Sequence, residues 1–110
     1  VIAFLSARVG SISDNTLGGW YSYRSSKTAL NQIVKNFSIE LKRTNKNAIA
    51  LALQPGTVES KFSEPFKKNV SKDKLFTPDY SVELLSQVIE GSSANESGSL
   101  LSYDGEIIKP

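Results

Sequence analysis

The sequence predicts an α/β fold in which helices cover both faces of a parallel sheet, with elements in the order β-α-β-α-β. Two short, wholly apolar segments, residues 1–5 and 48–53, predict central strands that are buried on both faces. The segment between them has apolar residues at helical spacing, and parallel neighbouring strands need such a crossover connection. These three observations predict one doubly wound parallel sheet.

The first strand and the loop after it open the chain. Residues 1–5 begin inside an apolar run, without an initiating methionine or a polar lead-in. Because a central strand needs neighbours on both sides, we expect residues 1–110 to be part of a longer protein. Residues 6–19 contain three serines and three glycines, a composition typical of a loop at the carboxyl end of a strand.

A long helix is predicted from about residue 21 to residue 43. Its apolar residues recur at steps of three and four and give it one buried face: Leu30, Ile33, Val34, Phe37 and Leu41. Lys42 and Arg43 suit the negative carboxyl end of a helix. The second strand then stops at Pro55 and Gly56, which interrupt regular structure.

The remaining elements are shorter. Residues 57–76 are irregular, and we expect a short helix and a flexible loop there. Thr77 as an N-cap and Pro78 at the first helical position predict a helix that ends at Gly91. Residues 99–103 predict a last short strand, followed by a turn at Asp104-Gly105 and a loose tail.

The composition is that of a soluble globular domain. The 110 residues, 39% hydrophobic and 22% charged, amount to one domain or less. Neither cysteine nor histidine occurs, so a thiol nucleophile and a metal site with soft ligands are excluded, and no metal is expected. No apolar run approaches a membrane span or a signal peptide, so we expect a cytoplasmic protein that does not bind membranes.

The charge pattern does not favour a nucleic-acid partner. The formal charge is +2, and one cluster of lysines lacks the interleaved aromatic residues on which bases stack: Lys67, Lys68, Lys72 and Lys74. We interpret this cluster as a solvated surface.

Tyr23 and Lys27 give the strongest chemical signal. Four residues apart on a helix, they lie on one face. An ammonium beside a phenol favours the phenolate, so the pair predicts a proton-transfer group with a lowered pKa. The ligands of open parallel sheets bind beyond the carboxyl ends of the strands, where both the Ser11 region and Pro55-Gly56 are expected.

The order of these motifs identifies a family. Gly10-Ser11 precedes Tyr23, residues 26–31 read Ser-Lys-x-Ala-Leu-Asn, and Pro55-Gly56-Thr57-Val58 follows the second strand. Over nearly its whole length the chain resembles the short-chain dehydrogenase/reductase family. Residues 10–12, 18–24 and 26–31 look more narrowly like the branch of C-factor and the sniffer-type carbonyl reductases. The resemblance implies that residues 1–110 are the carboxyl-terminal half of a Rossmann-like domain.

By this resemblance the protein would transfer a hydride between NAD or NADP and a small-molecule carbonyl compound or secondary alcohol. Tyr23 would be the general acid and base. Lys27 would lower the pKa of Tyr23 and would bind the nicotinamide ribose. A further cofactor-binding set would lie after the second strand: Pro55, Gly56, Val58 and Ser60.

The choice of the family's catalytic serine is ambiguous in this chain. When Gly10 is aligned with the glycine that follows that serine by three residues, Ala7 occupies the serine position. Ser11 lies twelve residues before Tyr23, close to the family's usual interval, so we assign the carbonyl-positioning hydroxyl to Ser11. Ser13 and Ser6 are the alternatives.

Other features carry weaker expectations. The family's glycine-rich dinucleotide fingerprint does not occur here, so the preference for NAD or NADP cannot be predicted. Residues 57–76, with Phe62 and Phe66, are expected to form a lid over the pocket.

Trp20 either shields the pocket or packs on the sheet, and Tyr21 either packs or contacts substrate. Asn31 would hydrogen-bond helix to strand. The resemblance also suggests a homodimer formed through the long helix.

Two other hypotheses belong to different functional classes. The chain could be a non-catalytic binding or scaffold module, which Ala7 and the missing fingerprint favour and which Tyr23 and Lys27 oppose. It could also bind RNA through its basic surface, which predicts strong salt dependence and a platform of aromatic residues.

Overall fold

The fold is built around one four-stranded sheet. The computed structural model describes residues 1–61, 64–65 and 70–110. Within them, β1 (Ile2–Leu5), β2 (Ala50–Gln54) and β5 (Leu100–Ser102) run parallel, and β6 (Ile107–Ile108) pairs antiparallel with β5. The strand order is β1-β2-β5-β6. The predicted α/β fold with a parallel sheet is confirmed.

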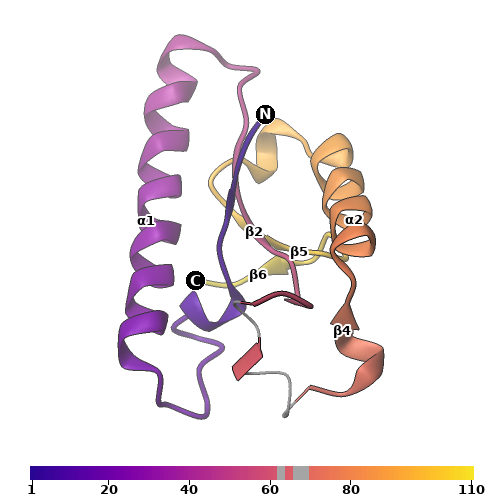
Figure 1. Cartoon of the computed structure of the whole chain (residues 1–110). Coiled ribbons are helices and arrows are strands. Elements are labelled where there is room, and N and C mark those ends of the chain that lie inside the picture. Colours follow the sequence, from indigo (N-terminus) through magenta and orange to yellow (C-terminus); the bar gives the residue numbers. More distant parts are fainter. Residues whose placement is uncertain (62–63, 66–69) are drawn as a thin grey trace.

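Two helices cover opposite faces of this sheet (Figure 1). The longer, α1 (Tyr21–Thr44), connects β1 to β2, and α2 (Pro78–Gly91) precedes β5. At the start of α2 the side chain of Thr77 accepts a hydrogen bond from the backbone N–H of Tyr80, with Pro78 in the first turn, as predicted.

Strand β2 explains why both helices dock. Its residues alternate between the two faces, so Ala50 and Ala52 join the core under α1, while Leu51 and Leu53 join the core under α2. The small alanines leave room for larger partners from α1 and β1: Phe4, Leu30, Val34 and Phe37. The strand is therefore buried on both sides, which is why its sequence reads as a continuous apolar run.

Two short pairings were not predicted. Residues 107–108 form β6, although a loose tail was expected after Asp104-Gly105. A second sheet pairs β3 (Thr57–Val58) with β4 (Leu75–Phe76), where irregular chain was expected. Both pairings involve two-residue strands, too short to show an alternating pattern, and the partners of the second sheet lie far apart in sequence.

Short turns of helix lie between these elements. Short 3-10 helices occur at η1 (Arg8–Gly10), η3 (Lys72–Lys74) and η4 (Ala94–Glu96). Phe62 and Phe66 of the expected lid, and Lys67 and Lys68 of the lysine cluster, lie outside the described residues. In the part of the chain that the structure describes, no helix is long and apolar enough to cross a bilayer.

Candidate active site

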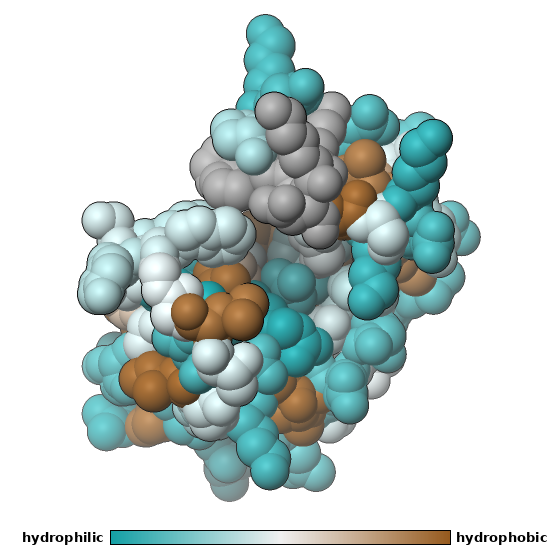
Figure 2. Space-filling view, turned by 90° about the horizontal axis from the view of Figure 1, so that it is seen from below, coloured by the Kyte–Doolittle hydropathy of each residue, from teal (hydrophilic) through white to brown (hydrophobic). Residues whose placement is uncertain are grey.

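A cavity of about 240 Å³ opens beyond the carboxyl ends of β1 and β2. Figure 2 looks onto this end of the molecule and shows a hollow near the middle of the face. The walls come from the loop after β1, from the start of α1 and from the segment after β2: Ser6, Ala7, Arg8, Val9, Trp20, Tyr23, Gln54, Pro55, Gly56, Thr57, Val58 and Ser60. The location agrees with the general position of ligand sites in open parallel sheets.

Tyr23 lies on this cavity, with Lys27 one helical turn behind it. The Nζ of Lys27 is 5.8 Å from the centroid of the Tyr23 ring, within the range of a cation–π contact. The same Nζ donates a hydrogen bond of 3.2 Å to the carbonyl oxygen of Leu5 at the end of β1. The predicted pairing on one helix face is therefore present, with the ammonium anchored to the sheet.

The expected effect of Lys27 on the acidity of Tyr23 is absent here. Partial burial raises the pKa of the Tyr23 phenol above its ordinary value of 10.0, because the phenolate would lose hydration. The ammonium contacts the ring face and is shared with the Leu5 carbonyl. The prediction of a lowered pKa is thus wrong for this structure, and Tyr23 is held in its protonated form at neutral pH.

The loop before α1 takes a left-handed turn at three successive residues. Gly18, Gly19 and Trp20 have φ of 67°, 73° and 50°. Glycine adopts this region freely, but a tryptophan there costs roughly 1–2 kcal/mol. Arg24 supports the turn, because its Nε donates to the Gly19 carbonyl at 3.0 Å and its Nη2 to the Gly18 carbonyl at 3.2 Å.

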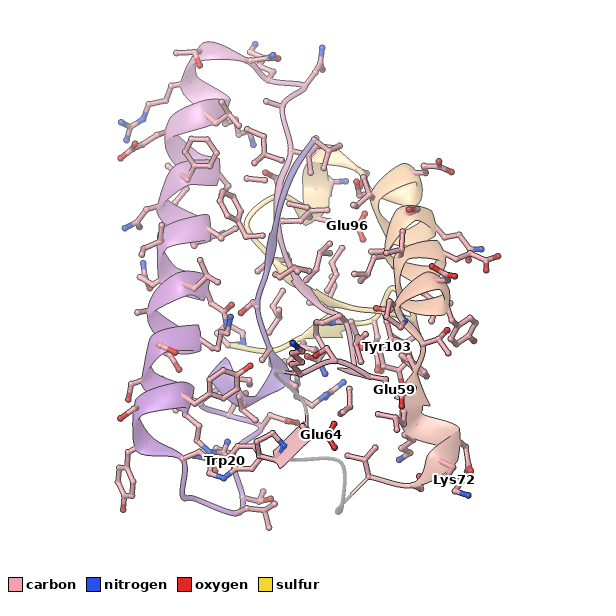
Figure 3. The ribbon with its side chains drawn as sticks, in the orientation of Figure 1. Trp20, Glu59, Glu64, Lys72, Glu96 and Tyr103 are labelled. Carbon is pink, nitrogen blue, oxygen red and sulfur yellow. The ribbon has the colours of Figure 1, made fainter. Side chains whose placement is uncertain are left out.

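This turn sets the place of Trp20, which borders the cavity and is 53% exposed. In Figure 3 its indole points from the start of α1 toward the end of the molecule where Glu59 and Glu64 lie. Of the two predicted roles, the structure supports shielding of the pocket. Tyr21 is 86% exposed and does not line this cavity, so neither role predicted for it is seen.

Polar residues of α1 fix the loop that follows β1. The hydroxyl of Thr28 donates to the Gly10 carbonyl at 2.8 Å, and the hydroxyl of Ser6 donates to Oδ1 of Asn31 at 2.5 Å. The expected hydrogen bond between Asn31 and the strand end is therefore present, with Ser6 as the donor. Together with the bond from Lys27 to Leu5, these contacts hold the end of β1 against the first half of α1.

The structure does not bring Ser11 to Tyr23. Ser11 is 1% exposed and lines a different, more open groove on the other side of the loop. Its hydroxyl donates to the carbonyl oxygen of Lys109 in the segment after β6 and accepts from the backbone N–H of Asp14 at 3.2 Å. Ser11 therefore ties the loop to the C-terminal segment, and its assignment to the carbonyl-positioning role is not supported.

The alternative serines differ from one another. Ser13 is exposed, and its hydroxyl lies 3.4 Å from the Ser11 hydroxyl. Ser6 does line the cavity, but its hydroxyl is engaged with Asn31. Ala7, at the position where the resemblance expects serine, is on the cavity wall and is 9% exposed. At this position the cavity wall therefore has the methyl group of Ala7 in place of the serine hydroxyl that the resemblance implies.

The segment after β2 forms another wall of the cavity, which includes the four residues expected to bind the cofactor: Pro55, Gly56, Val58 and Ser60. Gly56 has φ +78°, and an added Cβ would lie 2.8 Å from the Phe76 ring and 3.2 Å from that of Tyr103. Phe76 and Tyr103 contact edge to face at 4.9 Å between centroids, and Tyr103 is labelled in Figure 3. A glycine is required here because the bare backbone fits between the cavity and this aromatic pair.

Sequence reasoning missed three polar residues on the cavity: Arg8, Gln54 and Thr57. Gln54 is the last residue of β2, and its Oε1 accepts a hydrogen bond of 3.2 Å from the backbone N–H of Arg8. The signal that could have found Arg8 and Gln54 is their place directly beyond an apolar strand. Among the described residues, no cluster of three or more metal-ligating side chains occurs.

Comparisons with curated proteins give relatives along nearly the whole chain, although no family model matches it. The C-signal protein of Myxococcus xanthus is 35% identical over 104 residues, which cover 94% of this chain and 57% of that protein. The 1-hydroxy-2-glutathionyl-2-methyl-3-butene dehydrogenase of Rhodococcus sp. (strain AD45) is 32% identical over 108 residues, 98% of this chain and 46% of that protein. The chain thus spans about half the length of these relatives.

Solved structures agree with this result. The carbonyl reductase Sniffer of D. melanogaster matches with a TM-score of 0.81 and 28% identity, over 98% of this chain and 41% of that one. The NADPH-bound carbonyl reductase from chicken fatty liver matches with a TM-score of 0.84 and 28% identity, over 99% of this chain and 42% of that one. Both matches cover nearly all of this chain and less than half of the solved structure.

Proposed function

Because the chain belongs to the short-chain dehydrogenases/reductases, we propose that it is the carboxyl-terminal half of an enzyme that reduces carbonyl compounds with NADPH. The observation that carries the proposal is a single cavity lined both by Tyr23 and by the segment from Pro55 to Ser60. A proton donor and a bare backbone wall therefore face the same space.

The choice of NADPH is supported by two similar structures, one with NADPH bound and one, a short-chain dehydrogenase/reductase from Burkholderia multivorans, with NADP bound. The residues present fit the nicotinamide end of such a cofactor. Gly56 gives the cavity a wall without a side chain, against which a flat ring can lie. A site for the pyrophosphate would lie in the preceding half of the enzyme.

A reduced nicotinamide held in this cavity would supply the hydride to the carbonyl carbon. Tyr23 holds a proton at its Oη at neutral pH and gives it to the carbonyl oxygen as that oxygen gains negative charge. The C=O bond becomes an alcohol C–O–H. Lys27 is fixed to the Leu5 carbonyl with its ammonium over the Tyr23 ring, and in this proposal it would bind the nicotinamide ribose.

The proposal is tested on the full-length protein that contains this chain. Oxidation of NADPH, followed by the loss of its absorbance, is expected to depend on added aromatic aldehydes and ketones. NADH serves as the comparison cofactor. Tight NADPH binding without oxidation of cofactor by any carbonyl would contradict the enzymatic proposal.

The Ala7 position favours a second candidate, a cofactor-binding module without catalytic activity. The cavity wall at Ala7 offers a methyl group, so one donor to a carbonyl oxygen is missing at the place where the resemblance expects it. This candidate predicts that the full-length protein binds NADPH and reduces no carbonyl. The enzyme remains the better proposal because Tyr23 faces the cavity with a cation behind it.

A pair of variants tests which position in the loop meets the substrate. We expect Ala7→Ser to raise kcat/KM by about tenfold, since a hydroxyl on the cavity wall can donate to the carbonyl oxygen. Ser11→Ala is expected to leave kcat/KM unchanged and to lower the free energy of unfolding by about 1 kcal/mol, because a buried hydrogen bond is lost. A collapse of kcat/KM in Ser11→Ala at normal stability would restore the assignment to Ser11.

The raised pKa of Tyr23 predicts a pH profile. In the reducing direction the phenol must be protonated, so kcat/KM should stay level through neutral pH and fall only above pH 10.0, where Tyr23 loses its proton. In the oxidising direction, with alcohol and NADP, the rate should rise with pH. An apparent pKa near neutrality in the reducing direction would show that another group is the acid.

A further inference from the structure

Arg8 is the one charged side chain among the described residues that line the Tyr23 cavity. It lies in η1, two residues beyond Ser6 at the end of β1, and it is half-buried. The hydrogen bond from its backbone N–H to Oε1 of Gln54 fixes its backbone at the edge of the sheet. Its position is therefore set by the same strand ends that build the cavity.

The guanidinium of Arg8 is weakly engaged. Its Nη1 lies 3.6 Å from Oδ1 of Asp14, and the two side chains are 42% and 45% exposed. An ion pair of that length and exposure contributes little to stability. A guanidinium carries five N–H donors, and this contact is its only side-chain partner among the described residues. Most of its donors can therefore turn to a bound anion.

The rest of the cavity fits an apolar body rather than a second charge. Ala7, Val9 and Val58 contribute aliphatic surface, and the indole of Trp20 contributes a flat aromatic face. Tyr23 and Arg8 line the same cavity, so one bound compound can contact both side chains. A carboxylate is the group that a guanidinium binds best, through two parallel hydrogen bonds.

We propose that Arg8 binds the carboxylate of the substrate, so that the preferred substrates are apolar aldehydes or ketones that carry a carboxylate, with Asp14 as the competing internal anion. This proposal rests on the proposed reductase function and narrows its substrate class. The phosphates of the cofactor are the other source of an anion. Arg8 is paired with Asp14 of the loop before α1, whereas the proposed nicotinamide wall is the segment after β2, which favours the substrate.

Matched substrates test the proposal on the full-length protein with saturating NADPH. We compare 4-carboxybenzaldehyde with its methyl ester, which has the same aldehyde and no charge. Arg8→Gln is expected to lower kcat/KM for the acid by about 10- to 100-fold, because a hydrogen bond to a charged group is lost. The same variant should change kcat/KM for the methyl ester by less than about twofold. Arg8→Lys should recover part of the loss, because a point charge replaces a planar fork.

Asp14→Asn supplies a test of opposite sign. Removal of the competing carboxylate is expected to raise kcat/KM for the acid severalfold and to leave the ester unchanged. Arg43→Gln removes an exposed cation at the far end of α1 and is the matched control. This variant should leave kcat/KM unchanged for both the acid and the ester. The proposal would be overturned if Arg8→Gln lowered kcat/KM equally for the acid and the ester. It would also be overturned if the variant changed only the KM for NADPH.

A binding measurement separates this proposal from the proposed function. Calorimetry of benzoate and of benzamide with the NADP-bound full-length protein is expected to show binding of benzoate that Arg8→Gln abolishes, and weaker binding of benzamide that the variant does not change. If no carbonyl is reduced but benzoate still binds through Arg8, the reductase function fails and the anion site stands. If turnover is normal and benzoate binds Arg8→Gln as well as the native protein, the anion site fails alone.

Discussion

Tyr23→Phe is expected to lower the kcat of carbonyl reduction by about 10²- to 10⁴-fold in the full-length protein. The change removes one oxygen atom, so the ring, its packing and its contact with Lys27 remain, and the dissociation constant for NADPH should stay the same. The rate of reduction is measured from the absorbance of NADPH in a single turnover. The dissociation constant for NADPH is measured by fluorescence titration. A ring without a hydroxyl cannot protonate the carbonyl oxygen.

Tyr21→Phe is the matched control. The same change is made two residues away, at Tyr21. This side chain is 86% exposed and does not line the cavity. We expect native kinetics from this variant. Undiminished turnover in Tyr23→Phe would remove the phenol from the mechanism, and equal losses in both variants would point to disturbance of the start of α1 instead.

Gly10→Ala is expected to destabilise the fold by about 1–3 kcal/mol, the range for overpacking. A Cβ at residue 10 would lie 2.8 Å from the backbone carbonyl carbon of Lys27 and 2.8 Å from Nδ2 of Asn31. The helix backbone cannot rotate away as a flexible side chain can, so η1 and α1 must separate. Urea unfolding of the full-length protein measures this loss of stability.

The same variant should impair catalysis beyond its effect on stability. Separation of η1 from α1 breaks the bond from Thr28 to the Gly10 carbonyl and shifts Lys27 relative to Leu5. Gly91→Ala is the control, because a Cβ there meets no atom within 4 Å at the end of α2, and stability should stay level or rise by up to about 1 kcal/mol. Native stability in Gly10→Ala would mean that the loop and the helix do not meet as closely as described.

Regular elements with strong patterns were predicted well. The long helix predicted over residues 21–43 is α1 (Tyr21–Thr44), and the helix predicted from Thr77 and Pro78 is α2, which ends at Gly91. Helical periodicity and capping are local signals, so they can be read in sequence. The β3–β4 pair and β6 were missed because β3, β4 and β6 each have only two residues, and because β3 and β4 lie far apart in the sequence.

The candidate site was predicted in part. Tyr23 and the segment after β2 do share a cavity, since both lie beyond the carboxyl ends of parallel strands. Sequence spacing favoured Ser11, yet the C-terminal segment bonds that hydroxyl through Lys109, a contact between residues 98 positions apart. The spacing of residues in the sequence also did not predict that Arg8 lines the cavity or that it pairs with Asp14.

The sequence by itself determined the layered α/β architecture, the helix that carries Tyr23 and Lys27, and the family. Those properties follow from burial patterns and motif order, which act over a few residues at a time. The tertiary structure alone decided which hydroxyls face the cavity, and it raised the pKa of Tyr23 where the neighbouring lysine predicted the reverse. Acidity and access depend on the solvent that packing removes and on partners brought from distant segments, so they are fixed only when the chain is folded.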